Sequence, residues 1–243
     1  MIKPVIIVPC FNHADAFAPV ADKLLKFQLP IIVVDDGSTS QESKKIKSIC
    51  SKHKFFYLKN DKNGGKGAAM ITGFKFAINN KFTHALQIDA DGQHEVRDIP
   101  LFLKIANSHE KDLIVGNPIY DASAPRSRLI GRKITQFWVT VETFNKNMPD
   151  TMCGFRVYPL KLIEPVLKSI RFKRMGFDIE ILVKAFRYGI KLISVPTKVI
   201  YPETGVSHFR AFRDNFYISL LHSYLCCLIP SWLIRRAFHG KSK

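Results

Sequence analysis

Acidic residues are scarce in this chain. Among its 243 residues, 20 are Asp or Glu and 37 are Lys or Arg, which gives a formal net charge of +17. An excess of this size attracts phosphorylated substrates, anionic lipid surfaces or nucleic acid. The basic residues form no long run, so we expect no nucleic-acid partner and favour an anionic membrane surface.

Cysteine is also sparse. The five cysteines are an odd number, and no Cys-x-x-Cys pair is present. This pattern argues against a disulfide framework and a zinc ribbon, and it favours a reducing compartment. With 47% hydrophobic residues, the chain can form one sizeable domain, or one domain with an appendage.

The C-terminal apolar run falls short of a membrane span. Residues 216–229 provide about 14 apolar positions, whereas a spanning helix needs about 20. We expect Pro230 to end this helix. Trp232 and a basic cluster follow, an arrangement typical of a helix lying in the membrane interface. The alternative is a helix packed on the domain or in a dimer interface.

The chain start is expected to be a strand rather than a signal peptide, because its apolar run is short. Together with the basic C-terminal segment, this predicts a cytoplasmic protein that is peripheral on the inner face of the membrane.

Two common phosphate-binding loops are missing. The Walker A pattern is absent, and no Gly-x-Gly-x-x-Gly follows the first expected strand. The chain instead has Asn63-Gly64-Gly65-Lys66-Gly67 before an expected helix. Backbone N–H groups at a helix start favour phosphate, and Lys66 adds a full positive charge. The alternative is a flexible turn.

Short apolar runs alternate with amphipathic segments through the first half. The expected strands are residues 5–8, 31–34, 55–58, 84–88 and 113–116, and the expected helices are residues 15–27, 41–50, 66–78 and 99–106. This alternation predicts an α/β fold with a mostly parallel sheet and helices on both faces.

The second half is less regular. We expect helices at residues 126–145, 160–167 and 177–188, an edge strand at 154–158, and two short strands, 192–195 and 198–201, around Pro196. The predicted domain boundaries are 1–205 for the α/β domain and 206–243 for a C-terminal helical, membrane-associating segment.

Polar side chains follow several of the expected strands at their carboxyl ends, where open α/β sheets bind ligands. They are Asn12, Asp35, Asp36, Asp89 and Asp91. Asp89 and Asp91, with the amide oxygen of Gln93, suit a hard divalent cation such as Mg²⁺ or Mn²⁺. The alternative is an acidic surface turn.

The second half carries further candidates. Asp178 and Glu180 are two residues apart on an expected helix, so they point in different directions, and either could act as a general base on an acceptor hydroxyl. His208 could complete a metal shell. Four arginines could hold phosphate oxygens, although each could equally be a solvated charge: Arg126, Arg128, Arg132 and Arg156.

The ordered motifs resemble a known family. Val8-Pro9-Cys10-Phe11-Asn12, Val33-Val34-Asp35-Asp36-Gly37-Ser38, Asn63-Gly64-Gly65-Lys66-Gly67 and Asp89-Ala90-Asp91-Gly92-Gln93-His94 are similar to motifs of family 2 inverting glycosyltransferases with the GT-A fold. Two later segments, residues 150–156 and 176–180, resemble the dolichyl-phosphate mannosyltransferase-like branch. The resemblance covers roughly residues 3–200.

The resemblance implies roles for single residues. Nucleotide-sugar binding is implied for Pro9, Asn12, Asp36, Lys66 and Asp89, to which we add Asp35 and Ala90. Metal binding is implied for Asp89, Asp91 and Gln93, to which we add His208. Acceptor or phosphate binding is implied for Arg132 and Arg156, to which we add Arg126. From the residues themselves we assign catalysis to Asp91, Asp178 and Glu180. Cys153 departs from the branch, which often has Ser or Thr there, and the segment around His208 lies outside its pattern.

We therefore expect a metal-dependent, inverting transferase that moves a sugar from a GDP- or UDP-linked donor to a polyprenyl phosphate or another lipid or glycan acceptor. A lipid phosphate would need no base, whereas a hydroxyl would need Asp178 or Glu180. Two alternatives remain at this point. One is a nucleotidyltransferase on a related sheet, and the other is a basic, non-enzymatic module that binds membrane or nucleic acid.

Overall fold

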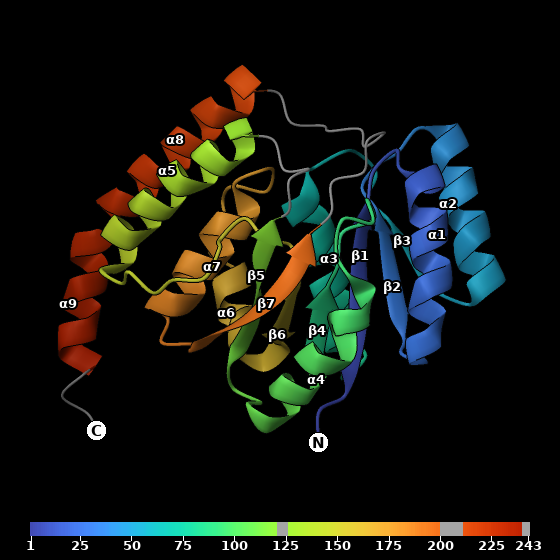
Figure 1. The fold of residues 1–243 in the computed structure, drawn as a ribbon, viewed down its shortest axis with the longest axis horizontal. Coiled ribbons are helices and arrows are strands. Elements are labelled where there is room, and N and C mark those ends of the chain that lie inside the picture. The colour runs from blue at the N-terminus through green and yellow to red at the C-terminus, as the bar shows by residue number, and fades with distance from the viewer. Residues whose placement is uncertain (121–125, 200–210, 240–243) are drawn as a thin grey trace.

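The computed structural model describes residues 1–120, 126–199 and 211–239 (Figure 1). The strands are β1 (Pro4–Cys10), β2 (Ile31–Asp35), β3 (Phe56–Lys59), β4 (His84–Gln87), β5 (Leu113–Tyr120), β6 (Arg156–Pro159) and β7 (Leu192–Val199). The α-helices are α1 (Ala14–Leu24), α2 (Ser40–His53), α3 (Lys66–Asn79), α4 (Ile99–Ser108), α5 (Arg126–Thr143), α6 (Leu160–Leu167), α7 (Phe177–Arg187), α8 (Ala211–Cys227) and α9 (Ile229–His239). Two 3₁₀ turns are η1 (Leu25–Phe27) and η2 (Val96–Asp98).

The seven strands form one sheet in the order β3-β2-β1-β4-β6-β5-β7. Every neighbouring pair is parallel except the two that involve β6. Side chains alternate across β1, so that Val5 and Ile7 belong to one apolar layer and Ile6 and Val8 to the other. Helices α3, α6 and α7 cover the first face and α1, α2 and α4 the second. The predicted mostly parallel α/β sheet is confirmed.

Strand β6 corrects one prediction. The sequence indicated an edge strand at residues 154–158, but β6 lies between β4 and β5 and runs antiparallel to both. All four of its residues are buried. An arginine and a proline in so short a strand are typical of a sheet edge, because a buried guanidinium needs several acceptors. Those acceptors come from distant segments that the local pattern does not reveal.

Strand β7 corrects a second prediction, because it is one continuous strand rather than two around Pro196. Its register with β5 runs through Pro196, which lies opposite Asn117. Among the described strands, β7 pairs with β5 and forms the edge of the sheet, and its last residue, Val199, makes an isolated bridge with His94. In an edge strand, a proline can occupy a position whose N–H would face away from the neighbouring strand. The proline then removes no hydrogen bond from the pairing.

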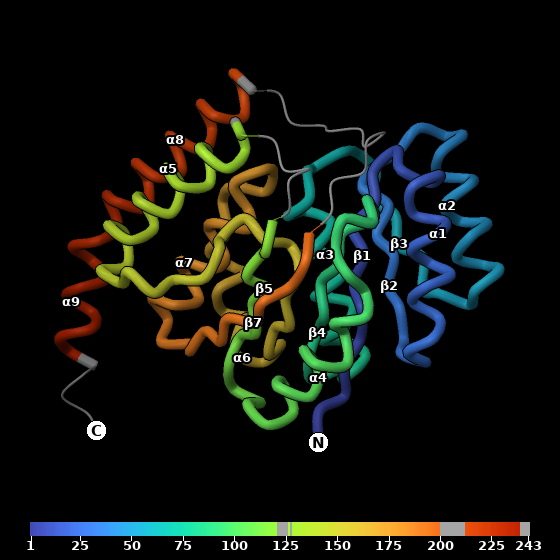
Figure 2. The backbone as a smooth tube through the Cα atoms, in the orientation of Figure 1, coloured from blue at the N-terminus to red at the C-terminus, as the bar shows by residue number. Residues whose placement is uncertain are grey.

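The C-terminal helices α8 and α9 lie at one end of the molecule, with α8 beside α5 (Figures 1 and 2). Helix α8 ends at Cys227, close to the expected end at Pro230, but Pro230 does not stop the chain from continuing as a second helix, α9. It occupies the first turn of α9, where a missing N–H costs no hydrogen bond. Among the described residues, one stretch, Phe212–Phe238, is long and apolar enough by length and composition to cross a membrane. The packing of its side chains bears on whether this stretch crosses a membrane or lies along its surface. The predicted boundary at 205/206 lies outside the described residues.

Candidate active site

The ends of β1 and β2 are tied together by their own polar groups. Asn12 has a positive φ of 50°, and its side-chain oxygen accepts a hydrogen bond of 2.9 Å from the Thr39 N–H. The Asn12 N–H in turn donates to Ser38 Oγ at 2.9 Å. Pro9 lies in β1, opposite Val34 of β2. These contacts shape one wall of the strand-end region.

Asp35 and Asp36 differ in environment although they are adjacent. The Asp35 carboxylate is fully buried and accepts hydrogen bonds from Ser43 Oγ at 2.5 Å and Tyr57 Oη at 2.8 Å. Burial alone would raise the pKa of Asp35, but these hydroxyl donors and Ser38 outweigh it and hold that pKa below its usual value. Asp35 is therefore engaged within the protein, and the structure does not direct it toward a ligand.

Asp36 connects β2 to the glycine-rich segment. Its carboxylate accepts hydrogen bonds from the Gly65 N–H at 2.6 Å and from Asn60 Nδ2 at 2.7 Å. The Gly67 N–H is also occupied, since it donates to the Lys173 carbonyl at 2.7 Å. Two amides that we expected to face phosphate are thus used inside the protein. What this segment presents to the strand ends is the Lys66 side chain.

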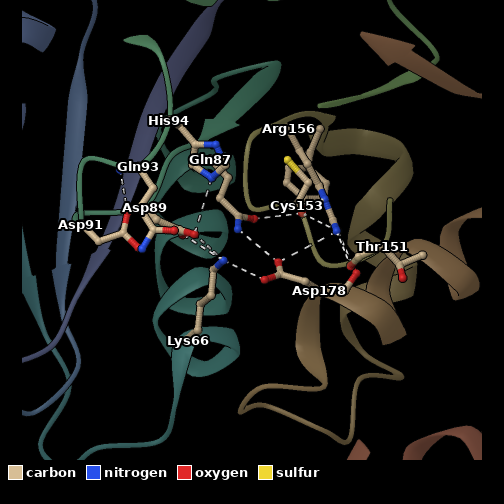
Figure 3. A network of polar contacts seen from close by, with 11 residues as sticks. Lys66, Gln87, Asp89, Asp91, Gln93, His94, Thr151, Cys153, Arg156 and Asp178 are labelled. Carbon is tan, nitrogen blue, oxygen red and sulfur yellow. Dashed lines mark hydrogen bonds and ion pairs between the residues drawn. The ribbon is translucent and has the colours of Figure 1, made fainter. Parts of the chain in front are cut away.

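Lys66 lies between two carboxylates, one from the turn after β4 and one from the first turn of α7 (Figure 3). Its Nζ is 2.7 Å from Asp178 Oδ2 and 2.9 Å from the Asp89 carboxylate. Burial opposes the charge on Lys66, but Asp178 and Asp89 outweigh it and raise the pKa of the lysine above its usual value. Lys66 is therefore a permanent positive charge at the carboxyl end of β4.

Asp89, Asp91 and Gln93 follow β4 as one turn. Asp91 Oδ1 accepts a hydrogen bond from the Gln93 N–H at 3.1 Å, and Gly92 has a φ of +72° that favours glycine. Burial and the neighbouring charge of Asp89 raise the pKa of Asp91. His94 Nε2 is 3.9 Å from Asp89 Oδ2, and burial lowers the pKa of this histidine.

The chemistry of this turn fits a divalent cation. His94 Nδ1 is buried without a hydrogen-bond partner, and Asp89 Oδ1 is buried with no hydrogen bond, its contact being the ion pair of 2.9 Å with Lys66. Two carboxylates crowded together in this way are stabilised by a positive ion. No cluster of three or more His, Cys, Asp or Glu side chains suited to a metal occurs within residues 1–120, 126–199 and 211–239. An ion held here would therefore take most of its ligands from the substrate or water, as Mg²⁺ usually does.

Gly154 allows the main chain to pass close to this ion pair. A Cβ atom at this position would lie 2.5 Å from Lys66 Nζ and closer still to Asp89 Oδ2. No real Cβ contact is that short, so any other residue would displace the carboxylate or the ammonium group. This close approach could not be predicted from local sequence, because residues 154 and 89 are distant in the chain.

Asp178 and Glu180 separate as their spacing predicts. Asp178 faces Lys66. Burial would raise the pKa of Asp178, but the charges of Lys66 and Arg156 outweigh burial and hold that pKa below its usual range. Glu180 is fully buried and accepts hydrogen bonds from the Phe172 N–H at 2.7 Å and Lys184 Nζ at 2.6 Å. The proposed catalytic role of Glu180 does not fit this placement, since its carboxylate holds a loop and a helix together.

Arg156 is also a correction. The sequence suggested a phosphate-binding arginine, but this side chain is fully buried in β6. Its guanidinium donates to the carbonyls of Thr151 at 2.7 Å, Cys153 at 2.8 Å and Asp178 at 2.8 Å. Because its donors are committed to backbone carbonyls, Arg156 joins β6 to α7 and is not presented to a phosphate.

The remaining arginines lie on α5. Arg132 is mostly buried, with Nη1 at 2.5 Å from Asp150 Oδ2 and its guanidinium over the Tyr120 ring. Arg126 is exposed in the first turn of the helix.

His208 lies outside the described residues. Ala90 is buried next to the acidic pair.

Sequence reasoning missed two side chains of this site. Gln87 Nε2 donates to Asp178 Oδ1 at 3.1 Å, and Gln87 Oε1 accepts from Tyr158 Oη at 2.9 Å. Both residues are fully buried. A signal for Gln87 was present, because an amide within the buried strand 84–88 requires partners. Nothing local indicated that Tyr158 would supply one.

This arrangement defines a class of protein. The parallel sheet carries a paired lysine and an acidic turn at its strand ends, as expected of an enzyme that binds a nucleotide-linked substrate. The model of the family described as glycosyl transferase family 2 matches residues 5–167, which is more than half of the chain. The chain belongs to this family and is a glycosyltransferase, and the two alternative functions lose their support.

Curated relatives and solved structures agree with this assignment. The chain is 26% identical over 230 residues to a UDP-N-acetylglucosamine–dolichyl-phosphate N-acetylglucosaminyltransferase of Methanococcus voltae, covering 88% of this chain and 92% of the relative. It is 28% identical over 212 residues to a dolichyl-phosphate beta-glucosyltransferase of Dictyostelium discoideum, covering 78% and 64%. A glucosyl-3-phosphoglycerate synthase from Mycobacterium tuberculosis in complex with Mn²⁺ and UDP-glucose shares the fold, with a TM-score of 0.66, 15% identity and coverage of 90% and 75%.

Proposed function

We propose that this glycosyltransferase moves a sugar from a GDP- or UDP-linked donor to a polyprenyl phosphate at a membrane surface, with inversion at the anomeric carbon. The observation that carries the acceptor assignment is the state of Asp178. Its carboxylate is paired with Lys66 and hydrogen-bonded by Gln87, and its pKa lies below the usual range. Relatives that are named for dolichyl phosphate support the same acceptor class.

A hydroxyl acceptor would need a base, and general bases work best when their pKa lies near the working pH. The depressed pKa of Asp178 makes it a weak base, and Glu180 is buried with its own partners. A phosphate monoester is already anionic. One of its oxygens can attack the anomeric carbon directly, while the bond to the donor diphosphate breaks and the nucleoside diphosphate leaves with the electron pair.

The donor side of the site uses residues at the strand ends. Pro9, Asn12 and Asp36 would line the nucleotide pocket, and Lys66 would face the diphosphate. Asp89, Asp91 and Gln93 would hold Mg²⁺ or Mn²⁺, which when bound neutralises charge on the leaving diphosphate. Arg126 and Arg132 on α5 remain our proposed contacts for the acceptor phosphate.

A panel of UDP- and GDP-sugars with purified protein tests this function. We expect one donor to be consumed with polyprenyl phosphate and not with the unphosphorylated polyprenol of equal length. Addition of EDTA should stop the reaction, and excess Mg²⁺ or Mn²⁺ should restore it. Transfer to polyprenol or to another hydroxyl acceptor at a comparable rate would contradict the proposed acceptor, and release of pyrophosphate would contradict the proposed chemistry.

Helices α5, α8 and α9 support the membrane location. Large apolar side chains are exposed on all three: Ile130, Ile134, Phe137 and Trp138 on α5, Phe212, Phe216, Tyr217 and Leu220 on α8, and Leu233, Ile234 and Phe238 on α9. We call these residues the apolar helical surface. Exposed apolar groups in this number mark an interaction site. Basic residues on the same helices, including Lys133, Arg235 and Arg236, favour an anionic lipid partner.

The packing of α8 favours a helix that lies at the membrane rather than across it. Ile218, Leu221 and Leu225 are buried in the same apolar cluster as α7 and one face of the sheet. His222 is buried as well, with Nδ1 at 2.7 Å from Glu142 Oε1 of α5. A spanning helix would have to give up these contacts, whereas an interfacial helix can keep them and bury its outer side in lipid.

Vesicle binding tests the apolar helical surface. The wild-type protein should cosediment with vesicles that contain anionic phosphatidylglycerol, and less with pure phosphatidylcholine or at high salt. The double variant Phe137→Ser, Phe216→Ser should bind at least about tenfold more weakly, because each buried Phe contributes about 1.5–3 kcal/mol. Phe56→Ser removes an equally apolar side chain from β3, at the far end of the sheet, and should bind as the wild type does.

A dimer is the competing use of this surface. Light scattering without lipid would then report a dimer that the double variant converts to a monomer, and neither protein would bind vesicles. That result would contradict the membrane assignment.

A further inference from the structure

A chain of hydrogen bonds runs from the buried Arg156 to the site (Figure 3). Arg156 Nη1 lies 3.4 Å from Tyr158 Oη, and Tyr158 Oη lies 2.9 Å from Gln87 Oε1. Gln87 Nε2 is 3.1 Å from Asp178 Oδ1, and Asp178 Oδ2 is 2.7 Å from Lys66 Nζ. Arg156, Tyr158 and Gln87 are fully buried, so water does not compete for these contacts.

The direction of every bond in this chain is fixed by its first member. A guanidinium can only donate, so the Tyr158 oxygen accepts from Arg156 and its hydrogen is left for Gln87. Gln87 must then present Oε1 to the tyrosine and its NH₂ group to Asp178. Burial raises the pKa of Tyr158 to about 12, which keeps its hydrogen in place. The ionised Asp178 carboxylate can only accept, so it requires the same orientation of the Gln87 amide, and the Tyr158 hydroxyl holds the opposite end of that amide in place.

We propose that Gln87 and Tyr158 are positioning residues that hold the Asp178 carboxylate in one orientation and thereby place the Lys66 ammonium group beside the donor diphosphate. This inference rests on the proposed function, in which Lys66 faces the leaving group. Neither residue touches the substrate. Asp178 is held by Gln87 on one oxygen and by Lys66 on the other, so rotation of this carboxylate would break its contact with the ammonium group and leave Lys66 held by Asp89 alone.

The expected kinetic effect falls on kcat. Negative charge on the diphosphate grows as the glycosidic bond breaks. A misplaced Lys66 therefore stabilises the transition state less, while its effect on the bound ground state is smaller. Tyr158→Phe and Gln87→Met should each lower kcat by about tenfold, with less than about a twofold change in the donor KM. Because both residues act through Asp178, the double variant should also lose about tenfold and not a hundredfold.

A merely structural role gives a different result. Each variant would then lower the melting temperature, kcat would stay at the wild-type value below that temperature, and losses of stability would add. Tyr57→Phe is the matched control, because it removes a hydroxyl that donates to the buried Asp35 carboxylate at 2.8 Å outside this chain. It should lower the melting temperature and leave kcat unchanged.

A measurement that needs no turnover separates this proposal from the proposed function. The Lys66 side-chain ammonium should give a protected ¹H–¹⁵N resonance in the wild-type protein, assigned by its loss in Lys66→Met. That resonance should shift or broaden in Tyr158→Phe and in Gln87→Met, and stay in place in Tyr57→Phe. An unchanged resonance in both variants would overturn the positioning role. A changed resonance in a protein that transfers no sugar would refute the proposed function and leave the positioning of Lys66 supported.

Discussion

Replacing Asp91 with asparagine should lower the rate of sugar transfer by about a thousandfold, equivalent to about 4 kcal/mol of transition-state stabilisation. Asp91 is one of two carboxylates in the turn after β4, and burial together with the charge of Asp89 raises its pKa. An amide of the same shape keeps the accepted bond from the Gln93 N–H but carries no charge for a divalent ion. The fold should therefore persist while donor activation is lost.

Three measurements check this expectation. Initial rates at saturating donor report the loss of activity, and electron paramagnetic resonance of free Mn²⁺ in the presence of the nucleoside diphosphate reports the loss of metal binding. The melting temperature should stay within a few degrees of the wild type, because relieving the repulsion from Asp89 does not destabilise the turn. Glu164→Gln on α6 is the matched control, since it neutralises a half-exposed carboxylate in a surface pair with Lys168.

An Asp91→Asn protein that keeps more than a tenth of the wild-type rate would contradict the assignment. If it also bound Mn²⁺ as tightly as the wild type, the ion would have to be held elsewhere, and Asp89 would be the next residue to replace.

The arrangement of the sheet could be predicted because local patterns determine it. Continuous apolar runs such as residues 5–8 and 31–34 require burial on both faces, and the helices between them fix parallel neighbours. The carboxyl ends of β1, β2 and β4 then meet at one edge whatever the details of packing. The same local patterns therefore predict Asp36, Asp89 and Asp91 at one edge of the sheet.

The buried polar groups could not be predicted in the same way, since their roles depend on partners far away in the chain. Glu180 is a first-turn acid like Asp178, and its contacts with the amides of residues 171 and 172 and with Lys184 make it a structural group. The pattern of the glycine-rich segment predicted free backbone N–H groups. In the structure, the Gly65 N–H donates to Asp36 and the Gly67 N–H donates to the Lys173 carbonyl. Local sequence predicts which buried polar groups need hydrogen-bond partners, but it does not predict which distant residues supply them.

Replacing Arg156 with leucine should cost about 3–5 kcal/mol of unfolding free energy, the range for removing one member of a buried charged network. The guanidinium is fully buried and donates to three backbone carbonyls, those of Thr151, Cys153 and Asp178. Leucine would leave these acceptors buried without donors, and each unsatisfied group costs about 1–3 kcal/mol. Urea unfolding followed by circular dichroism measures the loss. Arg97→Leu, at an exposed pair with Glu95, should cost less than about 1 kcal/mol.

The same variant decides between the two roles of Arg156. If it bound the acceptor phosphate, as the sequence suggested, Arg156→Leu would raise the acceptor KM and leave the unfolding midpoint near that of the wild type. If it joins β6 to α7, the midpoint falls steeply, and Arg156→Lys recovers only part of the loss, because one ammonium group on a shorter reach cannot serve three carbonyls held in a fork. A rise in the acceptor KM without loss of stability would support acceptor binding by Arg156. The buried guanidinium would then have to become exposed when the acceptor binds.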